Sequence, residues 1–351
     1  MDGPKFKPSF HLNIDPSDFE HAAVDEKENL VIMRESVGFW KDGMKRLKRN
    51  KIAMVSVAVI LLFLIGAFIV PAFYPYSYEH IDKESGNLLP MQYSDAERGR
   101  MANGEKVFPH FAGTDQLGRD SMIRLLMGSR ISLLVGIIAS AIILVIGSIY
   151  GAIAGYFGGR ADMVMMRIVD IIYSVPDILI IIILSVTLKY PLKNLAESIP
   201  AFAWINTIGV SLICIFIVFS LLYWVSMARI VRGQILALKQ QEYVMAARAL
   251  GASSSRIIRR HLLTNCIGTL TVTTTLEIPS SIFTESFLSF LGLGVAAPMP
   301  SLGSMASEAL SGIWSYPHRL ISAAVMIGLI ILSFNLFGDG LRDAFDPKLK
   351  Q

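Results

Sequence analysis

The sequence EYVMAARALGASSSRIIRRHLLTN (residues 242–265) is polar, basic and alanine-rich, yet it lies between two of the most apolar segments of the chain. Residues 242–250 are mostly good helix formers, and Gly251 suits the position just after a helix end, where a left-handed residue is favoured. The serines at 253–255 are suited to cap a second helix. The segment therefore predicts two short helices joined by a tight turn and held at a membrane surface.

The composition of the whole chain indicates an integral membrane protein. Of its 351 residues, 53% are hydrophobic and 17% are charged, whereas soluble domains carry about 25% charged residues. The apolar residues fall in long runs, and about 20 consecutive apolar residues span a bilayer. The net charge of +4 is explained by Lys and Arg at cytoplasmic helix ends. Nucleic-acid binding is disfavoured, because no basic run is interleaved with stacking aromatic residues.

The apolar runs predict an all-α fold with six transmembrane helices and both termini in the cytoplasm. The expected segments are a cytoplasmic N-terminal tail with a basic flank (1–51), a first transmembrane helix (52–73), an extracytoplasmic loop (74–130), a five-helix core (131–337) that includes a cytoplasmic loop at 228–265, and a cytoplasmic C-terminal tail (338–351). Within the core, the expected spans are 131–157, 163–188, 208–227, 266–294 and 320–337. Lys and Arg are concentrated in the predicted inside segments, which supports this orientation.

Two acidic residues of the fifth expected span, Glu277 and Glu285, are candidates for lining a translocation path. A carboxylate inside a membrane is costly unless it faces protein or water. Glu285 therefore either lines a path or pairs with another helix. In the third expected span, Pro176 predicts a bend, and Asp170 is placed to pair with Arg167 one turn earlier.

Two further patterns predict local packing. Glycines at 147, 151 and 155 have the spacing that lets helices approach closely, which favours a tight contact within the chain over a contact with another subunit. In GTDQLGRD (residues 113–120), Asp115, Arg119 and Asp120 are expected to form an ion-pair cluster that orders the loop before the second span.

The small side chains of Ala246 and Ala247 would let a partner backbone approach the first short helix closely, and Tyr243 and Leu250 flank them at helical spacing. Such a helix fits a groove on a partner protein. The spacing alone equally fits an amphipathic helix lying among lipid headgroups with its arginines on the polar face.

Here the sequence resembles a known family. The segment is similar to the cytoplasmic loop of ABC importer permeases, which has the pattern Glu-x3-Ala-Ala-x3-Gly, matched by Glu242, Ala246, Ala247 and Gly251. Thr264 stands where that family usually has proline. Stretches at 39–54, 111–136 and 284–305 resemble the oligopeptide and dipeptide permeases of the second type, the last two through GTDQLGRD and TESFLSFLGLG.

The resemblance implies a type I ABC importer permease fold in which the segment 242–251, including Tyr243 and Leu250, is a coupling helix that seats in a cytoplasmic ATPase. The implied partners are a second, homologous permease, two cytoplasmic ATP-binding subunits, an extracytoplasmic peptide-binding protein and the lipid bilayer. The chain lacks GxxxxGK[ST], so ATP and Mg are expected on the partner ATPases, with no cofactor, metal or catalytic residue on this chain. The alternatives are a permease for nickel chelates or another small solute, and a stand-alone secondary transporter.

Overall fold

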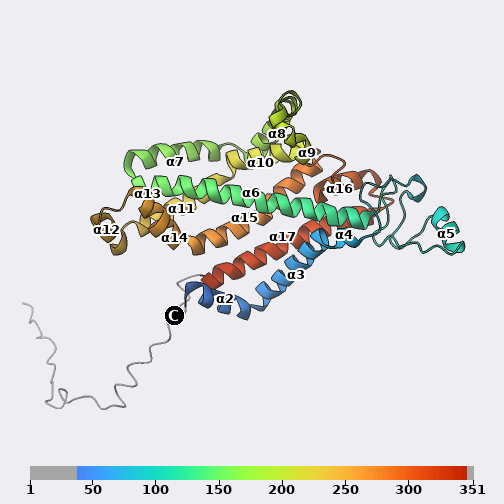
Figure 1. Ribbon diagram of the computed structural model, residues 1–351, viewed down its shortest axis with the longest axis horizontal. Helices are drawn as coiled ribbons and strands as arrows, with labels where there is room; N and C mark the ends of the chain where they lie inside the picture. Colours follow the sequence, from blue (N-terminus) through green and yellow to red (C-terminus); the bar gives the residue numbers. More distant parts are fainter. Residues whose placement is uncertain (1–37, 346–351) are drawn as a thin grey trace, which may run out of the picture. The chain divides into compact units, whose positions relative to one another are not determined.

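The computed structural model describes residues 38–345, and the account below concerns the compact unit that begins at Gly43. Parts of both predicted tails, 1–37 and 346–351, lie outside the described residues. The all-α fold class is confirmed, because the described residues form helices and no strand (Figure 1). The long helices are α3 (Lys51–Phe68), α6 (Ser121–Phe157), α7 (Gly159–Ser174), α8 (Asp177–Ser198), α10 (Val210–Leu222), α11 (Trp224–Leu238), α15 (Ile267–Phe290) and α17 (Pro317–Phe345).

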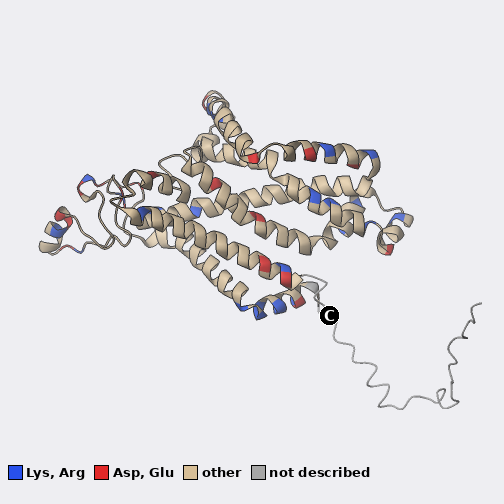
Figure 2. Cartoon of the chain, turned by 180° about the vertical axis from the view of Figure 1, so that it is seen from behind, with Lys and Arg blue, Asp and Glu red and all other residues tan. Residues whose placement is uncertain are grey.

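The shorter elements belong to the connections. They are α2 (Phe39–Arg49), α4 (Val70–Phe73), η2 (Lys83–Ser85), α5 (Asp95–Ala102), η3 (Pro200–Phe202), α9 (Trp204–Ile208), α12 (Glu242–Ala249), α13 (Ser254–Arg256), η4 (Ile257–Leu262), α14 (Leu263–Asn265), α16 (Leu302–Ala309) and η5 (Leu310–Gly312). Figure 2 shows that charged residues gather towards the ends of the long helices and that most of the middle is uncharged.

Five helical segments of the described chain are long and apolar enough to cross a membrane: Lys51–Phe73, Ser121–Phe157, Asp177–Ser198, Val210–Leu238 and Pro317–Phe345. A sixth long helix, α15, carries two glutamates and many Ser and Thr residues, which lower its hydropathy. It packs between α6 and α17, so neighbouring helices shield much of its polar surface. Five spans are thus supported by length and composition, and α15 is a sixth long helix at the position of the fifth predicted span.

Several helix bounds differ from the prediction. The helix α6 begins at Ser121 rather than at 131, because the Asp120 carboxylate caps its first turn by accepting the Ile123 N–H at 2.9 Å. The expected third span is two helices, α7 and α8, separated at Val175 and Pro176, so the proline breaks the helix rather than bending it. The last helix runs to Phe345, so residues 338–345 of the expected C-terminal tail are helical.

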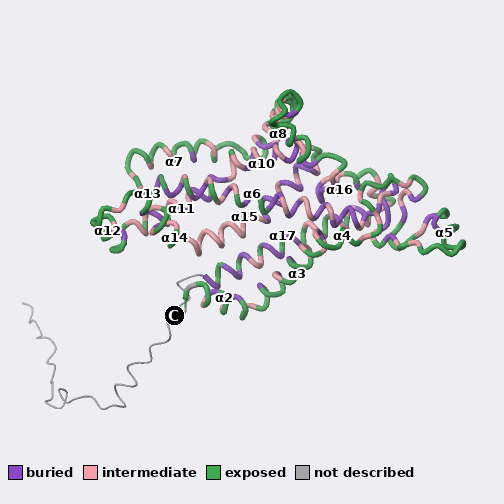
Figure 3. The backbone as a smooth tube through the Cα atoms, viewed as in Figure 1, coloured by how far each residue is buried: buried purple, intermediate pink, exposed green. Residues whose placement is uncertain are grey.

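Among the described residues, the helices α6 and α11 pack against each other more extensively than any other pair of helices, through the predicted glycine face. A Cβ atom added at Gly151 would lie 2.3 Å from the carbonyl oxygen of Ala228, and one at Gly147 would lie 2.6 Å from the Met227 Cβ. At Gly155 the nearest atom would be the Ile235 Cβ at 2.9 Å. The glycines thus serve a contact within the chain, as predicted. Figure 3 shows the buried stretches on α6 and the largely exposed surfaces of α7 and α8.

Two ion pairs connect α7 to α11. Arg232 contacts both carboxylate oxygens of Asp162, at 2.5 and 2.6 Å. Arg229 donates to Asp170 at 2.9 Å and lies over the Tyr173 ring at 4.3 Å. The expected pairing of Asp170 with Arg167 is therefore wrong. The carboxylate reaches a neighbouring helix instead of the preceding turn, because α7 packs alongside α11.

We expect the substitution Gly151→Ala to destabilise the chain by about 1–3 kcal/mol, because an added methyl group overpacks the α6–α11 contact. Gly233→Ala on α11 is the matched control, since nothing lies within 4 Å of a Cβ atom at that position. Thermal unfolding of both purified variants in detergent would test this. Equal unfolding midpoints would contradict the assigned glycine contact.

Candidate functional site

The polar segment between α11 and α15 folds as the predicted helix, turn and second helical stretch. The N–H of Gly251 donates to the Arg248 carbonyl, and the N–H of Ala252 donates to the Ala247 carbonyl, both at 3.0 Å. These two bonds form a Schellman turn, in which the residue after the helix takes a left-handed conformation. Gly251 has φ +78°. The Ser253 Oγ then caps α13 by accepting the Arg256 N–H at 3.4 Å.

One face of α12 is anchored and the other is open. Val244 is fully buried in the same apolar cluster as Ile257 and Leu262 of η4. The Tyr243 hydroxyl accepts a hydrogen bond from Asn265 Nδ2 at 3.2 Å. In contrast, Leu250 is 88% exposed. The short helix is therefore fixed to the following helical stretch while it presents an apolar end to the outside.

The remaining residues of the Glu-x3-Ala-Ala-x3-Gly pattern lie on this open side. Glu242 and Ala246 are exposed, and Ala247 is partly buried. Glu242 occupies the first turn of α12, where a carboxylate suits the helix dipole. The surface thus combines a small-residue middle with Leu250 at one end and the partly exposed ring of Tyr243, whose hydroxyl is held by Asn265, at the other. This is the shape expected of a helix that enters a groove.

Contacts to the bundle connect this loop to α6. The Arg248 guanidinium lies 5.7 Å from the ring centroid of Tyr156. The Lys239 Nζ donates to the carbonyl of Gly155 at 2.8 Å. Tyr156 and Gly155 both lie in the last turn of α6, so α12 and the end of α11 lie against the end of this long helix.

The two candidate path residues of α15 lie in different surroundings. Glu285 is fully buried, and its carboxylate accepts hydrogen bonds from Ser132 Oγ of α6 and Ser289 Oγ, each at 2.7 Å. The same Ser289 hydroxyl accepts the N–H of Val295 at 3.0 Å. This geometry corresponds to the alternative in which the carboxylate pairs with another helix, and it ties α15 to α6 and to the loop after α15.

Glu277 instead lines cavities. It faces one cavity of about 580 Å³ together with Asp177, Tyr223 and Ser280, and a second of about 780 Å³ near the start of α15. Within residues 38–345, no hydrogen bond or ion pair joins its carboxylate to another side chain. Glu277 therefore remains the candidate for lining a path, whereas Glu285 serves packing.

Comparison of the sequence with known proteins identifies a family. The family model described as binding-protein-dependent transport system inner membrane component matches residues 147–351. The chain belongs to that family. A second model, the N-terminal transmembrane domain of oligopeptide transport permease C, matches residues 38–90 of this permease.

Relatives of the permease that are described as transport system permease proteins align with most of the chain. It is 41% identical to the oligopeptide transport system permease protein OppC of Bacillus subtilis, over 97% of this chain and 99% of the relative. It is 40% identical to the dipeptide transport system permease protein DppC of the same organism, over 91% and 89%. It is also 36% identical to the glutathione transport system permease protein GsiD of Pectobacterium atrosepticum, over 89% and 92%. The permease is thus a multi-pass membrane protein of this family.

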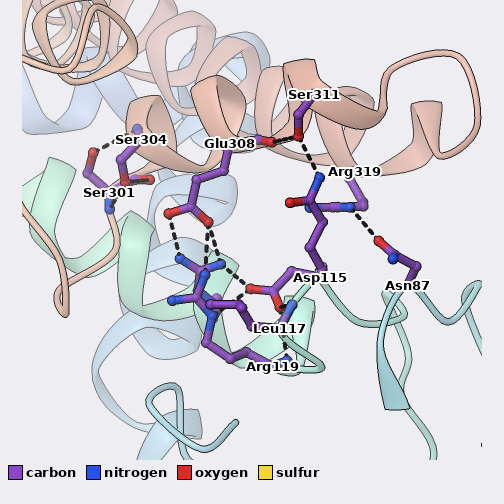
Figure 4. Close-up of polar contacts among 11 residues, drawn as sticks. Asn87, Asp115, Leu117, Arg119, Ser301, Ser304, Glu308, Ser311 and Arg319 are labelled. Atoms are coloured by element: carbon purple, nitrogen blue, oxygen red, sulfur yellow. Dashed lines mark hydrogen bonds and ion pairs between the residues drawn. The ribbon is translucent and has the colours of Figure 1, made fainter. Parts of the chain in front are cut away.

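The loop before α6 of the permease contains the predicted ion-pair cluster and a partner that the sequence did not reveal. Asp115 contacts Arg119 at 2.6 Å and Arg124 at 2.5 Å. Glu308 of α16 contacts the same two arginines, at 3.0 and 2.8 Å (Figure 4). Asp120 takes a different role, because it caps α6. The cluster therefore fastens α16 to the start of α6 in addition to ordering the loop.

A second buried polar cluster, also missed from the sequence, lies in the same loop. The His110 ring bridges two carboxylates, with Nδ1 at 2.7 Å from Asp120 and Nε2 at 3.0 Å from Glu97. The Tyr76 ring stacks on it at 4.5 Å. Burial lowers the pKa of His110, but the hydrogen bonds to Asp120 and Glu97 outweigh burial and raise the pKa above its usual value. Burial also raises the pKa of Tyr76, to about 12.

We expect the backbone amides of the loop around His110 to lose protection from hydrogen exchange at alkaline pH. Because the folded-state pKa is raised, the protonated ring contributes its full stability below the unfolded pKa of about 6.5 and loses that stability as pH rises through the folded-state pKa. Hydrogen exchange of residues 74–120, corrected for intrinsic rates, would measure this. His110→Gln should remove the pH dependence, whereas His80→Gln, at an exposed position, should retain it. An unchanged profile in His110→Gln would refute the assignment.

For Glu285→Ala we expect a loss of roughly 2–4 kcal/mol, because the change opens a cavity and leaves two buried hydroxyls without their acceptor. Glu285→Gln keeps one acceptor and should cost less. Glu277→Ala is the control on the same helix, since that carboxylate faces a cavity. Thermal unfolding in detergent would rank the three variants, and an unfolding midpoint for Glu285→Ala equal to that of Glu277→Ala would be evidence against a packing role for Glu285.

Proposed function

We propose that this chain is the membrane-spanning permease subunit of an ATP-driven importer of oligopeptides or dipeptides. The observation that carries the proposal is the coincidence of family membership with α12, an exposed and anchored helix that bears the Glu-x3-Ala-Ala-x3-Gly pattern. The two relatives named above for oligopeptide and dipeptide transport align over about nine-tenths or more of this chain. Import of nickel chelates is not favoured, because the relatives described above are named for peptides and glutathione.

In the proposed assembly, this chain forms the translocation path with a second, homologous permease. An extracytoplasmic peptide-binding protein delivers the substrate, and Glu277 lines the path. Two cytoplasmic ATP-binding subunits hold ATP and Mg, so this chain binds no cofactor and catalyses no reaction itself. The loop 228–265 and both termini face the cytoplasm, which is supported by the many Lys and Arg residues of those segments.

The ATPases would act on this chain through α12. Leu250 and Tyr243 would seat in a cleft of one ATPase, and the alanines would allow close backbone approach. A ligand shifts a two-state equilibrium only through different affinities for the two states, so the ATP-bound ATPases must favour one separation of the coupling helices. Movement of α12 would then pass through Val244 to η4 and α15, and through Arg248 to α6, and so change the access of the path.

We expect Gly251→Val to reduce peptide uptake at least tenfold while leaving membrane insertion intact. A β-branched side chain strongly disfavours φ +78°, and the Schellman turn that orients α12 would be lost. Glu242→Lys should act in the same direction by reversing the charge at the helix start. The measurement is ATP-driven uptake of a labelled tripeptide into proteoliposomes that contain the assembled complex and saturating binding protein.

Gly251→Asn is the matched control, because asparagine tolerates a left-handed conformation. It should retain most of the uptake. Normal uptake in a chain carrying both Gly251→Val and Glu242→Lys would refute the coupling role of α12. Peptide transport by the chain alone, without ATP, would instead favour a stand-alone secondary transporter.

A further inference from the structure

The junction of α2 and α3 carries a dense group of basic side chains that the proposed function does not use. Residues 43–51 contain five Lys and Arg residues and no acidic residue. Four of the five are exposed, and we call them the basic collar: Lys45, Lys48, Arg49 and Lys51. Within the described part of the chain, none of these four forms an ion pair. Their charge is therefore available to an external anion.

The opposite side of α2 is fixed to the bundle, so the basic collar has a defined orientation. Leu47 is buried in a cluster with Ala53, Leu341 and Phe345. A Cβ atom at Gly43 would lie 2.3 Å from the Phe345 ring, which shows how closely the two helices approach. On a helical wheel, positions 43 and 47 share one face, and 45 and 49 lie on the opposite face.

The backbone places the basic collar at the border of an apolar span. Asn50 separates the two helices, and its side chain caps α3 by accepting the N–H groups of Ile52 and Ala53. Ile52 and Val55, which follow directly, are 62% and 65% exposed. In the most apolar 18-residue stretch of the span Lys51–Phe73, only 22% of the residues are buried by the rest of the chain. The exposed apolar surface of α3 faces lipid, so the basic collar lies at the level of the headgroups.

Acidic side chains on α17 only partly offset this charge. Asp339 and Asp343 are exposed and flank Gly340, whose added Cβ would lie 3.6 Å from Asn50 Nδ2. Neither carboxylate forms an ion pair with the collar, and Arg342 lies between them in sequence. The surface therefore keeps an excess of positive charge beside an apolar helix.

We propose that the basic collar binds the phosphate groups of anionic phospholipids and holds them at the start of α3. Lys and Arg next to a membrane attract anionic headgroups, by about fivefold in lipid enrichment for each residue. The long methylene stems of Lys45 and Lys48 would lie along the apolar surface while the ammonium groups reach the phosphates. This inference goes beyond the proposed transport function and does not depend on the substrate.

The test uses the full-length chain reconstituted in phosphatidylcholine vesicles that contain a small fraction of spin-labelled phosphatidylglycerol. The preference for phosphatidylglycerol over phosphatidylcholine is measured from the immobilised spectral component. In the variant K45Q/K48Q/R49Q, this preference should be at least fivefold lower than in the unmodified chain. The control K83Q/R98Q/K106Q removes three exposed charges from the loop 74–120, away from any apolar span, and should retain the preference.

Salt provides a second measurement on the unmodified chain. A rise to 1 M salt shortens the screening length to about 3 Å and should abolish most of the preference. An identical preference in K45Q/K48Q/R49Q and the unmodified chain would overturn the proposal. Displacement of the labelled lipid by millimolar glycerol phosphate would also overturn it, because it would assign the collar to a soluble anion.

Discussion

The close approach of α6 and α11, which depends on glycines at 147, 151 and 155, constrains the rest of this chain. It allows the basic residues of α11 to reach the flank of α7, as the Arg232–Asp162 contact illustrates. It also brings the end of α11 beside the end of α6, where the loop that carries α12 begins. The functional surface is therefore an extension of the glycine contact: a looser approach would separate α12 from the helix that it is proposed to move.

The two glutamates of α15 lie in different surroundings, because one is packed against α6 and the other lies against cavities. Glu285 satisfies its carboxylate with serine hydroxyls of α6 and α15, in a region where Gly303 also brings α16 against the Ser286 backbone. This part of α15 is therefore tightly packed against α6 and α16. Glu277, two helical turns earlier, lies against cavities. A membrane carboxylate without a partner is tolerated where water reaches it, so these surroundings suit the role in the path that we propose for Glu277.

The sequence predicted those features whose signals are local. The helix at 242–249 and the left-handed Gly251 follow from neighbouring residue types, and the all-α class follows from the apolar runs. The sequence did not predict Glu308 as the partner of Arg119 and Arg124, because α16 folds back onto α6 from a distant position in the chain. The predicted pairing of Asp170 with Arg167 is wrong for the same reason. Because α7 packs against α11, Asp170 pairs with Arg229 of that helix instead of with the preceding turn.

The loop 74–120 contains a buried polar cluster that is connected to the start of α6. His110, Glu97 and Asp120 are buried together outside the apolar spans, and Asp120 also caps α6. Through Asp120, this cluster is joined to the start of the same helix that contacts Arg248 and Lys239 at its other end. A single helix of about 55 Å, from its 37 residues at about 1.5 Å each, thus connects the cluster of the loop to the region of α12.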